Sequence, residues 1–481
     1  MPSSWLFKQQ AYIAGQWIND KDNAIQQVHN PATGELLGTV PMLGADATRQ
    51  AINSAEAARH QWAARTAKER SRVLMRWYDL MMAHVNELAE ILTLEQGKPL
   101  AEARGEIAYA ASFLEWFAEE GKRVYGDVIP THKPDARLVV VKQPIGVVAA
   151  VTPWNFPAAM ITRKCAPALA AGCSFVVKPA PETPFSALAL AALAEKAGVP
   201  AGIFNVITGD ALAIGGELTS SKIIRKLSFT GSTKIGKLLM QQCAGSVKKV
   251  SLELGGNAPF IVFNDADLNA AVEGAMASKF RNAGQTCVCT NRFLVQDEVH
   301  DLFLEKLTTA VKQLKTGNGM EPEVTQGPLI NAAAVEKITD HVADAVAKGA
   351  IVTTGGEPQA EASNFYKPTV VYNVTSDMKV AKEETFGPLA PVFRFSTEEE
   401  AISMANDTDS GLAAYVYTRD IGRAWRTGES LEYGMVGINE GIISTEVAPF
   451  GGIKESGTGR EGSRYGIEDY VEIKYMMMGG I

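Results

Sequence analysis

The segment most able to carry chemistry lies around Cys287, in the run Phe-Arg-Asn-Ala-Gly-Gln-Thr-Cys-Val-Cys of residues 280–289. It places a cysteine after a glycine-containing turn and just ahead of a predicted strand. An ionised thiol in such a position can act as a covalent nucleophile. A free cysteine is more often a small buried hydrophobe, so these residues alone favour an inert thiol.

Two other segments place polar side chains at the ends of apolar strands, and they favour a catalytic role for Cys287 over an inert thiol. Glu253 lies in the apolar run Val250–Leu254, where burial should raise the pKa of its carboxyl group and make it a usable base. Asn155 follows the run Val147–Val151, in a loop that two prolines stiffen. A thiol, a carboxylate and an amide are therefore candidates for one catalytic group.

Gly231 and Ser232 lie where phosphate binding is expected, after the predicted strand Lys226–Phe229 and before the predicted helix Thr233–Ala244. The free N–H groups and positive dipole end at such a helix start suit a pyrophosphate. On these residues alone, an ordinary Gly-Ser helix cap is more frequent than a phosphate-binding site. The run Gly457–Gly462 has the spacing of a dinucleotide fingerprint, but too little chain follows it to complete a βαβ unit, so it is predicted to be a loop.

Two blocks of alternating strands and helices have to position these side chains. Residues 45–120 are predicted to be helical, because apolar residues recur there at i, i+3, i+4 and i+7. From residue 145 to 254, and again from 260 to about 440, β-rich runs alternate with helical stretches. Such alternation predicts βαβ units and doubly wound parallel sheets of the α/β class, whose ligands bind beyond the carboxyl ends of the strands.

The predicted strands of the first block are Val147–Val151, Ser174–Val177, Phe204–Ile207, Lys226–Phe229 and Val250–Leu254. Its predicted helices are Ala158–Ala171, Pro184–Ala197, Leu212–Thr219 and Thr233–Ala244. The second block includes strands Phe260–Phe263, Phe293–Val295, Val392–Phe395, Ala414–Tyr417 and Val436–Asn439, with helices near 299–315 and 331–348. The short strands Leu138–Lys142 and Tyr470–Met477 have no partner helix, and we expect them to pair elsewhere, for example across a subunit interface.

Composition narrows the class of protein. A chain of 481 residues is long enough for two or three domains, and its net charge of −8 with scattered basic residues argues against a nucleic-acid partner. We find no apolar run of about 18 residues and no signal-peptide pattern, so we expect neither a membrane span nor secretion. Five cysteines do not make a disulfide framework in so long a chain, and the six histidines are scattered. We therefore expect a cytoplasmic protein with reduced thiols and no metal site.

Six short motifs resemble the aldehyde dehydrogenase superfamily in order and spacing, and the similarity runs from about residue 10 to the C-terminus. They are Trp154-Asn155, Lys178-Pro179, Phe229-Thr-Gly231-Ser232, Glu253-Leu-Gly-Gly, Gly284-Gln-Thr-Cys287 and Glu384-Thr-Phe386-Gly-Pro. The resemblance implies an aldehyde dehydrogenase-like fold. It would have a Rossmann-type cofactor domain (1–121 and 146–254), an α/β catalytic domain (255–445), and a small β oligomerisation arm with the C-terminal segment (122–145 and 446–481). It also implies a homo-oligomer, a dimer of dimers.

The resemblance also implies a role for each catalytic candidate. Cys287 would attack the aldehyde carbon, the Asn155 amide and the Cys287 N–H would hold the oxyanion, and Glu253 would activate water to hydrolyse the thioester. The residues implied to bind the cofactor are Trp154, Asn155, Lys178, Pro179, Ala180, Pro181, Gly231, Ser232, Leu254, Glu384 and Phe386.

The implied cofactor is NAD or NADP. Pro181 has no side-chain donor for a 2′-phosphate, and the charge of Glu182 would repel one. Lys178 acts in the opposite direction. On balance we expect a weak preference for NAD.

Within the superfamily, the residues around Arg163, Arg281 and Ser444 resemble the site at which succinate-semialdehyde dehydrogenases bind the distal carboxylate of the substrate. A guanidinium presents a planar fork of donors that suits a carboxylate. The implied reaction is oxidation of succinate semialdehyde to succinate, with glutarate semialdehyde and sulfolactaldehyde as alternative small anionic aldehydes. A non-catalytic dinucleotide-binding protein, or a thioesterase using Cys287, is a more remote alternative.

Cys289 lies two residues from the candidate nucleophile. Similar Cys-x-Cys enzymes suggest a reversible Cys287–Cys289 disulfide that would switch activity off under oxidation. A ring so short is strained and should be easily reduced.

Overall fold

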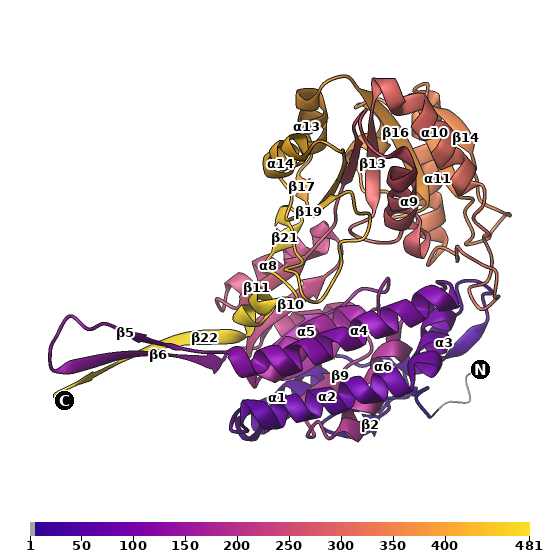
Figure 1. Cartoon of the computed structure of the whole chain (residues 1–481). Helices are drawn as coiled ribbons and strands as arrows, with labels where there is room; N and C mark the ends of the chain where they lie inside the picture. Colours follow the sequence, from indigo (N-terminus) through magenta and orange to yellow (C-terminus); the bar gives the residue numbers. More distant parts are fainter. Residues whose placement is uncertain (1–4) are drawn as a thin grey trace.

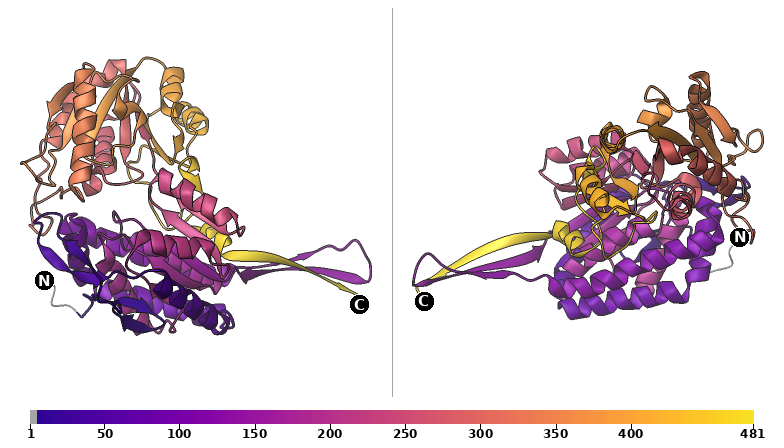
Figure 2. Two further views of the ribbon diagram at one scale, coloured as in Figure 1. Left: turned by 180° about the vertical axis from the view of Figure 1, so that it is seen from behind. Right: turned by 45° about the horizontal axis from the view of Figure 1, so that its top comes forward.

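The structure is a computed structural model, and it describes residues 5–481. Two lobes, each built on a central sheet, lie one above the other, and a narrow β arm projects from one side (Figure 1). Two further views show the arm extending away from both lobes, with the C-terminus at its tip (Figure 2). Within residues 5–481, no helix is long and apolar enough to cross a membrane.

The helices predicted between residues 45 and 120 are present and pack through apolar stripes. In α2 (Ala67–Ala83), the buried side chains include Val73, Leu74, Trp77 and Met81, which recur at helical spacing. The other helices of this group are α1 (Ala45–Ala63), α3 (Val85–Gln96) and α4 (Leu100–Glu120).

The lower lobe of Figure 1 contains an eight-stranded sheet within the described residues, in the order β2-β1-β9-β8-β7-β10-β11-β21. The five strands predicted for the first block are its central strands, and they run parallel. They are β9 (Phe204–Val206), β8 (Ser174–Lys178), β7 (Val147–Val151), β10 (Ile224–Thr230) and β11 (Lys249–Glu253). The antiparallel outer strands are β1 (Ala11–Ile13), β2 (Gln16–Ile18) and β21 (Gly457–Thr458). β21 lies in the run that we predicted to be a loop, and it extends the sheet edge without starting a βαβ unit.

Helices cover both faces of this sheet. In β7, Val148 and Ala150 belong to the apolar core shared with α2 to α6, whereas Val147 and Ala149 belong to the core shared with α1, α7 and α8. The helices not yet bounded are α5 (Ala159–Ala171), α6 (Pro184–Ala197), α7 (Ala211–Ser220) and α8 (Thr233–Ala244). Because both faces of the sheet are buried, the sequences of these parallel strands are continuous apolar runs.

The upper lobe contains a second sheet, of seven strands in the described chain, in the order β14-β15-β16-β13-β12-β18-β19. Its strands are β12 (Ala258–Val262), β13 (Thr290–Gln296), β14 (Ile351–Thr354), β15 (Thr369–Tyr372), β16 (Leu389–Phe395), β18 (Ala413–Tyr417) and β19 (Met435–Ile438), of which β14 is antiparallel. Its helices are α9 (Leu268–Lys279), α10 (Asp297–Val311), α11 (Ala332–Ala347), α12 (Lys379–Lys382), α13 (Glu398–Asn406) and α14 (Ile421–Ser430). Apolar residues of α9 and α10 pack on one face of the sheet, and those of α11 and α13 on the other. The predicted doubly wound α/β fold is therefore confirmed.

The two strands predicted to lack a partner helix pair with each other inside the chain. β6 (Ala136–Pro144) runs antiparallel to β22 (Val471–Gly479), and β5 (Asp127–Ile129) lies on the other side of β6. Tyr470, which we predicted to begin the last strand, instead ends a 3-10 segment, η3 (Arg464–Tyr470). The arm in Figures 1 and 2 is this three-stranded sheet. Two smaller pairs are β3 (Ile25–His29) with β4 (Leu36–Pro41), and β17 (Ser410–Gly411) with β20 (Ile453–Lys454).

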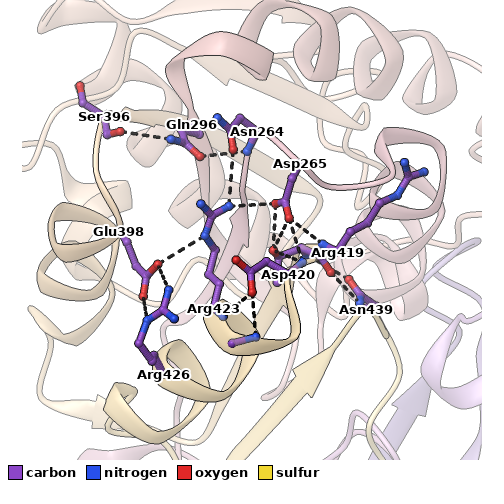
Figure 3. Close-up of polar contacts among 12 residues, drawn as sticks. Asn264, Asp265, Gln296, Ser396, Glu398, Arg419, Asp420, Arg423, Arg426 and Asn439 are labelled. Carbon is purple, nitrogen blue, oxygen red and sulfur yellow. Dashed lines mark hydrogen bonds and ion pairs between the residues drawn. The ribbon is translucent and has the colours of Figure 1, made fainter.

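A polar network closes the carboxyl edge of the second sheet (Figure 3). Asp265, which follows β12, accepts hydrogen bonds from the Thr418 hydroxyl at 2.8 Å and the Asp420 N–H at 2.9 Å. It also pairs with Arg423 at 2.9 Å. Because the network joins the loops after β12 and β18 to α14, it fastens this edge of the sheet. The catalytic candidates lie at the opposite, amino edge.

Candidate active site

The predicted catalytic residues meet where the carboxyl ends of the first sheet approach the amino end of β13. Asn155 follows β7, Gly231 follows β10, Glu253 ends β11, and Cys287 precedes β13. Cys287 lines two cavities, so its side chain lies where the two adjoin. The arrangement agrees with the rule that open α/β sheets bind ligands beyond the carboxyl ends of their strands.

The loop that carries Cys287 has an unusual backbone. Asn282 and Ala283 adopt left-handed conformations, with φ of 52° and 55°, and Gly284 follows with φ of 72°. A Cβ atom at Gly284 would lie 2.2 Å from the carbonyl oxygen of Gly387, so only glycine allows this close approach. Strained backbone of this kind persists where surrounding contacts hold it, often at functional sites.

The Cys287 side chain is half-buried between the cavities. Burial raises the pKa of its thiol to about 12, while the Arg163 guanidinium acts in the opposite direction. The backbone N–H of Cys287 donates to no acceptor within residues 5–481, which leaves it available to a ligand.

Asn155 is oriented by contacts at both its side chain and its backbone. Its side-chain nitrogen donates to the Gln285 carbonyl at 3.0 Å, and its side-chain oxygen has no partner in the described part of the chain. Its own carbonyl accepts hydrogen bonds from Lys98 at 2.8 Å and from the Asn282 side chain at 3.0 Å. Since an amide nitrogen carries two N–H groups, one remains free for a ligand.

Glu253 is a buried carboxylate whose oxygens are both unpaired. The residue is 2% exposed, and neither carboxylate oxygen has a hydrogen-bond partner among the described residues. Burial, with a smaller contribution from Glu461, raises the pKa of Glu253 well above its ordinary value. The predicted rise is thus confirmed. A carboxylate held in this state is suited to accept a proton from water.

The glycine-loop cavity, which contains Gly231 and Ser232, has a volume of about 360 Å³. Seven of the predicted cofactor residues line it, namely Trp154, Asn155, Gly231, Ser232, Leu254, Glu384 and Phe386. Ser232 is the residue at the start of α8, yet its side chain makes no capping hydrogen bond. The N–H groups at the helix start are therefore open to an anion. This favours a pyrophosphate site over an ordinary helix cap.

The lysine cavity, of about 550 Å³, contains Lys178 and Pro181, and Ile330 lines both it and the glycine-loop cavity. Three carboxyl side chains also line the lysine cavity, namely Glu95, Glu182 and Asp210. Pro179 and Ala180, which were predicted to bind cofactor, are buried and line neither of these two cavities. The carbonyl of Pro179 instead accepts a hydrogen bond from Lys178 at 3.1 Å.

The arginine cavity, of about 270 Å³, brings together Arg163, Arg281 and Ser444 beside Cys287. The three residues come from α5, from the nucleophile loop and from the loop after β19, so their convergence is a property of the tertiary fold. Within residues 5–481, Arg281 forms no ion pair shorter than 4 Å, although the Glu102 carboxylate lines the same cavity and interacts with it electrostatically. Arg163 is fully buried and pairs with Glu461 at 2.5 Å.

Sequence reasoning missed several residues that line the arginine cavity or hold its walls, namely Lys98, Glu102, Glu106, Phe156, Phe450 and Glu461. One signal was available. Glu102 and Glu106 lie four residues apart on α4, so they share a face of a helix whose other buried residues are mostly apolar.

Cys289 is buried and lines none of the three cavities. Its thiol donates to the Gly284 carbonyl at 3.1 Å, and Lys279 lies 4.0 Å from its sulfur. The intervening residue is also fixed, because the Tyr415 hydroxyl donates to the Val288 carbonyl at 2.7 Å. A Cys287–Cys289 disulfide stays a prediction, and it would require the loop to rearrange.

Comparisons with known proteins show the family of this chain. Residues 17–476 match the model of the aldehyde dehydrogenase family. The chain is 65% identical over 474 residues to an NADP(+) succinate-semialdehyde dehydrogenase of Escherichia coli, with 98% of each chain covered. It is 63% identical over 476 residues to a glutarate-semialdehyde dehydrogenase of Pseudomonas aeruginosa, with 99% of each covered. The crystal structure of a succinate-semialdehyde dehydrogenase from Burkholderia pseudomallei superposes with a TM-score of 0.99 at 64% identity, covering 100% of this chain and 99% of that one. This chain belongs to the aldehyde dehydrogenase family.

Proposed function

We propose that this protein oxidises succinate semialdehyde to succinate with NAD or NADP as the acceptor. The observation that carries the proposal is the arginine cavity, in which two guanidinium groups lie in the same 270 Å³ space as the candidate nucleophile Cys287. The names of the relatives above support the same class of substrate. Glutarate semialdehyde and sulfolactaldehyde are second candidates, because each combines an aldehyde with a distal anion that the same arginines would hold.

In the proposed mechanism, ionised Cys287 attacks the aldehyde carbon to form a thiohemiacetal. The free N–H of the Asn155 amide and the backbone N–H of Cys287 stabilise the oxyanion that develops. Bound nicotinamide dinucleotide supplies the hydride acceptor that makes a thioester possible. Glu253 then takes a proton from water, which attacks the thioester carbonyl, releases the acid and returns Cys287 as a thiolate.

The dinucleotide would be held along two adjoining cavities. Gly231 and Ser232 at the open start of α8 would bind the pyrophosphate, and Glu384 with Phe386 would hold the nicotinamide ribose. Lys178 in the lysine cavity would contact the adenosine ribose. We retain Pro179 and Ala180 only as the buried backbone that positions Lys178.

We also propose a cytoplasmic homo-oligomer, a dimer of dimers, with the arm as its main contact. The arm exposes the apolar residues Val128, Ile129, Ile473, Tyr475, Met476, Met477 and Met478. Exposed apolar surface of this extent indicates an interaction site. The domain division that follows is a cofactor domain of 1–121 and 146–254, a catalytic domain of 255–445, and an arm and C-terminal segment of 122–145 and 446–481.

The substrate proposal predicts a selective effect of Arg281→Ala. A charge-assisted hydrogen bond contributes about 1.5–3 kcal/mol, so kcat/KM for succinate semialdehyde should fall roughly ten- to a hundredfold. Butanal has no distal anion, so kcat/KM for butanal should fall little. Steady-state kinetics with both aldehydes measures the difference, and Arg426→Ala on the outer face of α14 is the control. Equal losses for the two aldehydes would remove the basis for an anionic substrate.

Arg163→Ala should behave differently, because Arg163 already pairs with Glu461. Removing Arg163 takes away one of the positive charges that neutralise the buried Glu461 carboxylate, so kcat/KM should fall for both aldehydes. Arg281 is therefore the cleaner test of substrate charge.

Electrostatics of the lysine cavity predicts a higher kcat/KM with NAD than with NADP. Glu182 and Asp210 line the same cavity as Lys178 and would repel a 2′-phosphate, while Pro181 offers it no donor. Glu182→Gln should improve kcat/KM for NADP by roughly fivefold, the size of a like-charge contact of about 1 kcal/mol in a solvated site, and leave NAD nearly unchanged. Initial rates with both cofactors decide the matter, and a clear preference of the unmodified protein for NADP would refute the prediction.

A further inference from the structure

Lys98 and Glu106 form an ion pair that is buried beside the arginine cavity. Their charged atoms lie 2.6 Å apart, and their side chains are 1% and 0% exposed. Desolvating two charges is costly, so a buried pair of this kind is weak evidence for stability in itself. The contacts that the pair makes with other segments indicate a more specific role.

Each member of the pair holds one end of the segment that follows β7. The Lys98 ammonium donates to the Asn155 carbonyl at 2.8 Å. The Glu106 carboxylate accepts hydrogen bonds from the N–H groups of Ala158 at 3.0 Å and Ala159 at 3.3 Å, at the start of α5. The backbone from Asn155 to Ala159 is thereby fastened at both ends to α4 and the turn before it.

A neighbouring carboxylate on the same helix holds the nucleophile loop. Glu102 accepts a hydrogen bond at 2.8 Å from the N–H of Asn282, one of the left-handed residues ahead of Cys287. Asn282 in turn donates to the Asn155 carbonyl at 3.0 Å. The turn before α4 and its first turns therefore contact both chain segments that would form the oxyanion site.

The Lys98 ammonium makes three contacts with neighbouring groups. It contacts Glu106 and the Asn155 carbonyl, and it lies 3.9 Å from the centre of the Phe156 ring. An ammonium has three donors, and the hydrogen bonds to Glu106 and to the Asn155 carbonyl use two of them. Arg281 lines the same cavity and forms no ion pair shorter than 4 Å among the described residues, so its guanidinium is available to a distal anion.

We propose that Lys98 and Glu106 are positioning residues for Asn155. They fix the 155–159 backbone so that the free N–H of the Asn155 amide faces the carbonyl oxygen of a substrate bound to Cys287. The inference rests on the proposed role of Asn155 as an oxyanion donor. It adds that the donor is held in place from α4 and the turn before it, by a charge pair in the wall of the arginine cavity.

A double-mutant cycle between Lys98→Met and Asn155→Ala tests this inference in the intact protein. The readout is the rate of the first-turnover burst of reduced cofactor, followed by stopped-flow absorbance with succinate semialdehyde and with butanal. Asn155→Ala alone should slow the burst roughly a hundred- to a thousandfold, as loss of an oxyanion donor does. Lys98→Met alone should slow it roughly ten- to a hundredfold with both aldehydes, with little change in KM.

In the Asn155→Ala background, Lys98→Met should add less than about a threefold further loss, since the amide that it positions is already gone. A full additional loss in that background would overturn the inference, as would a loss confined to succinate semialdehyde. If Asn155→Ala keeps the unmodified burst rate, the proposed role of Asn155 itself fails.

Controls separate positioning from folding. Lys122→Met removes an exposed lysine that pairs with Glu119 at 3.5 Å just after the same helix, and it should leave the burst unchanged. Thermal unfolding shows whether Lys98→Met is folded. If it is not, the cycle uses Lys98→Arg, which keeps a charge beside Glu106, but whose planar fork does not reproduce the single ammonium contact with Asn155. Its smaller loss should likewise disappear in the Asn155→Ala background, and persistence of that loss would contradict positioning.

Discussion

Replacing Cys287 with alanine should abolish dehydrogenase turnover while cofactor binding is retained. The change removes only the sulfur that would form the covalent bond to the aldehyde carbon, and removal of a catalytic nucleophile typically costs at least about 10⁴-fold in kcat. Gly231, Ser232 and Glu384, which would hold the cofactor, are not altered. Absorbance of reduced cofactor measures turnover, and titration calorimetry with NAD and NADP measures binding.

Cys243→Ala is the matched control, because Cys243 is buried in α8 and packs in the core of the first sheet away from the cavities. It should keep turnover close to that of the unmodified protein. Turnover by Cys287→Ala within tenfold of the unmodified rate would exclude covalent catalysis through this thiol.

Glu253→Gln should produce a burst of reduced cofactor and then stall. The amide cannot accept a proton from water, so the thioester should accumulate after one turnover, and steady-state kcat should fall roughly 10²- to 10⁴-fold. In the unmodified protein the pKa of Glu253 is raised by burial, and a general base acts only when deprotonated. Steady-state turnover limited by this step should therefore increase with pH, and Glu253→Gln should lose that increase.

Stopped-flow absorbance at several pH values separates the burst from the steady state. Glu217→Gln changes a carboxylate on α7 that pairs with Arg49, and it serves as a control that should show neither effect. A Glu253→Gln variant without a burst would place Glu253 in an earlier step, and one with an unmodified steady-state rate would remove it from the mechanism.

The sequence predicted those parts of the fold and site that depend on local patterns. The apolar run at Val147–Val151 and the alternation that follows it indicated parallel strands, because burial on both faces leaves a continuous apolar signature. Asn155 and Glu253 could be singled out because each polar side chain follows or ends such a segment, and Cys287 because it follows a glycine-containing turn just ahead of a strand. The meeting of Asn155 and Glu253 at one edge follows from the parallel arrangement of β7 and β11, whereas Cys287 comes from the second sheet and is brought there by the tertiary fold.

Contacts between residues distant in the chain could not be predicted in this way. Arg163 pairs with Glu461, and Lys98 binds the carbonyl of Asn155, yet no periodic pattern connects these positions. The pairing of β6 with β22 joins strands that are more than 300 residues apart in sequence, and only the tertiary fold brings them together. The open cap at Ser232 also depends on side-chain geometry, since its sequence is that of an ordinary helix start.

The most direct test of the proposed function is the kcat/KM of the purified protein for a panel of aldehydes, followed by absorbance of reduced cofactor. The panel contains succinate semialdehyde, glutarate semialdehyde and sulfolactaldehyde, with butanal and pentanal as neutral aldehydes of similar length. Because Arg281 and Arg163 lie in the cavity beside Cys287, we expect the anionic aldehydes to exceed the neutral ones by at least about tenfold, the effect of one charge-assisted contact, with succinate semialdehyde first. Equal or higher kcat/KM for butanal and pentanal would contradict the proposal that this enzyme selects its substrate by a distal anion.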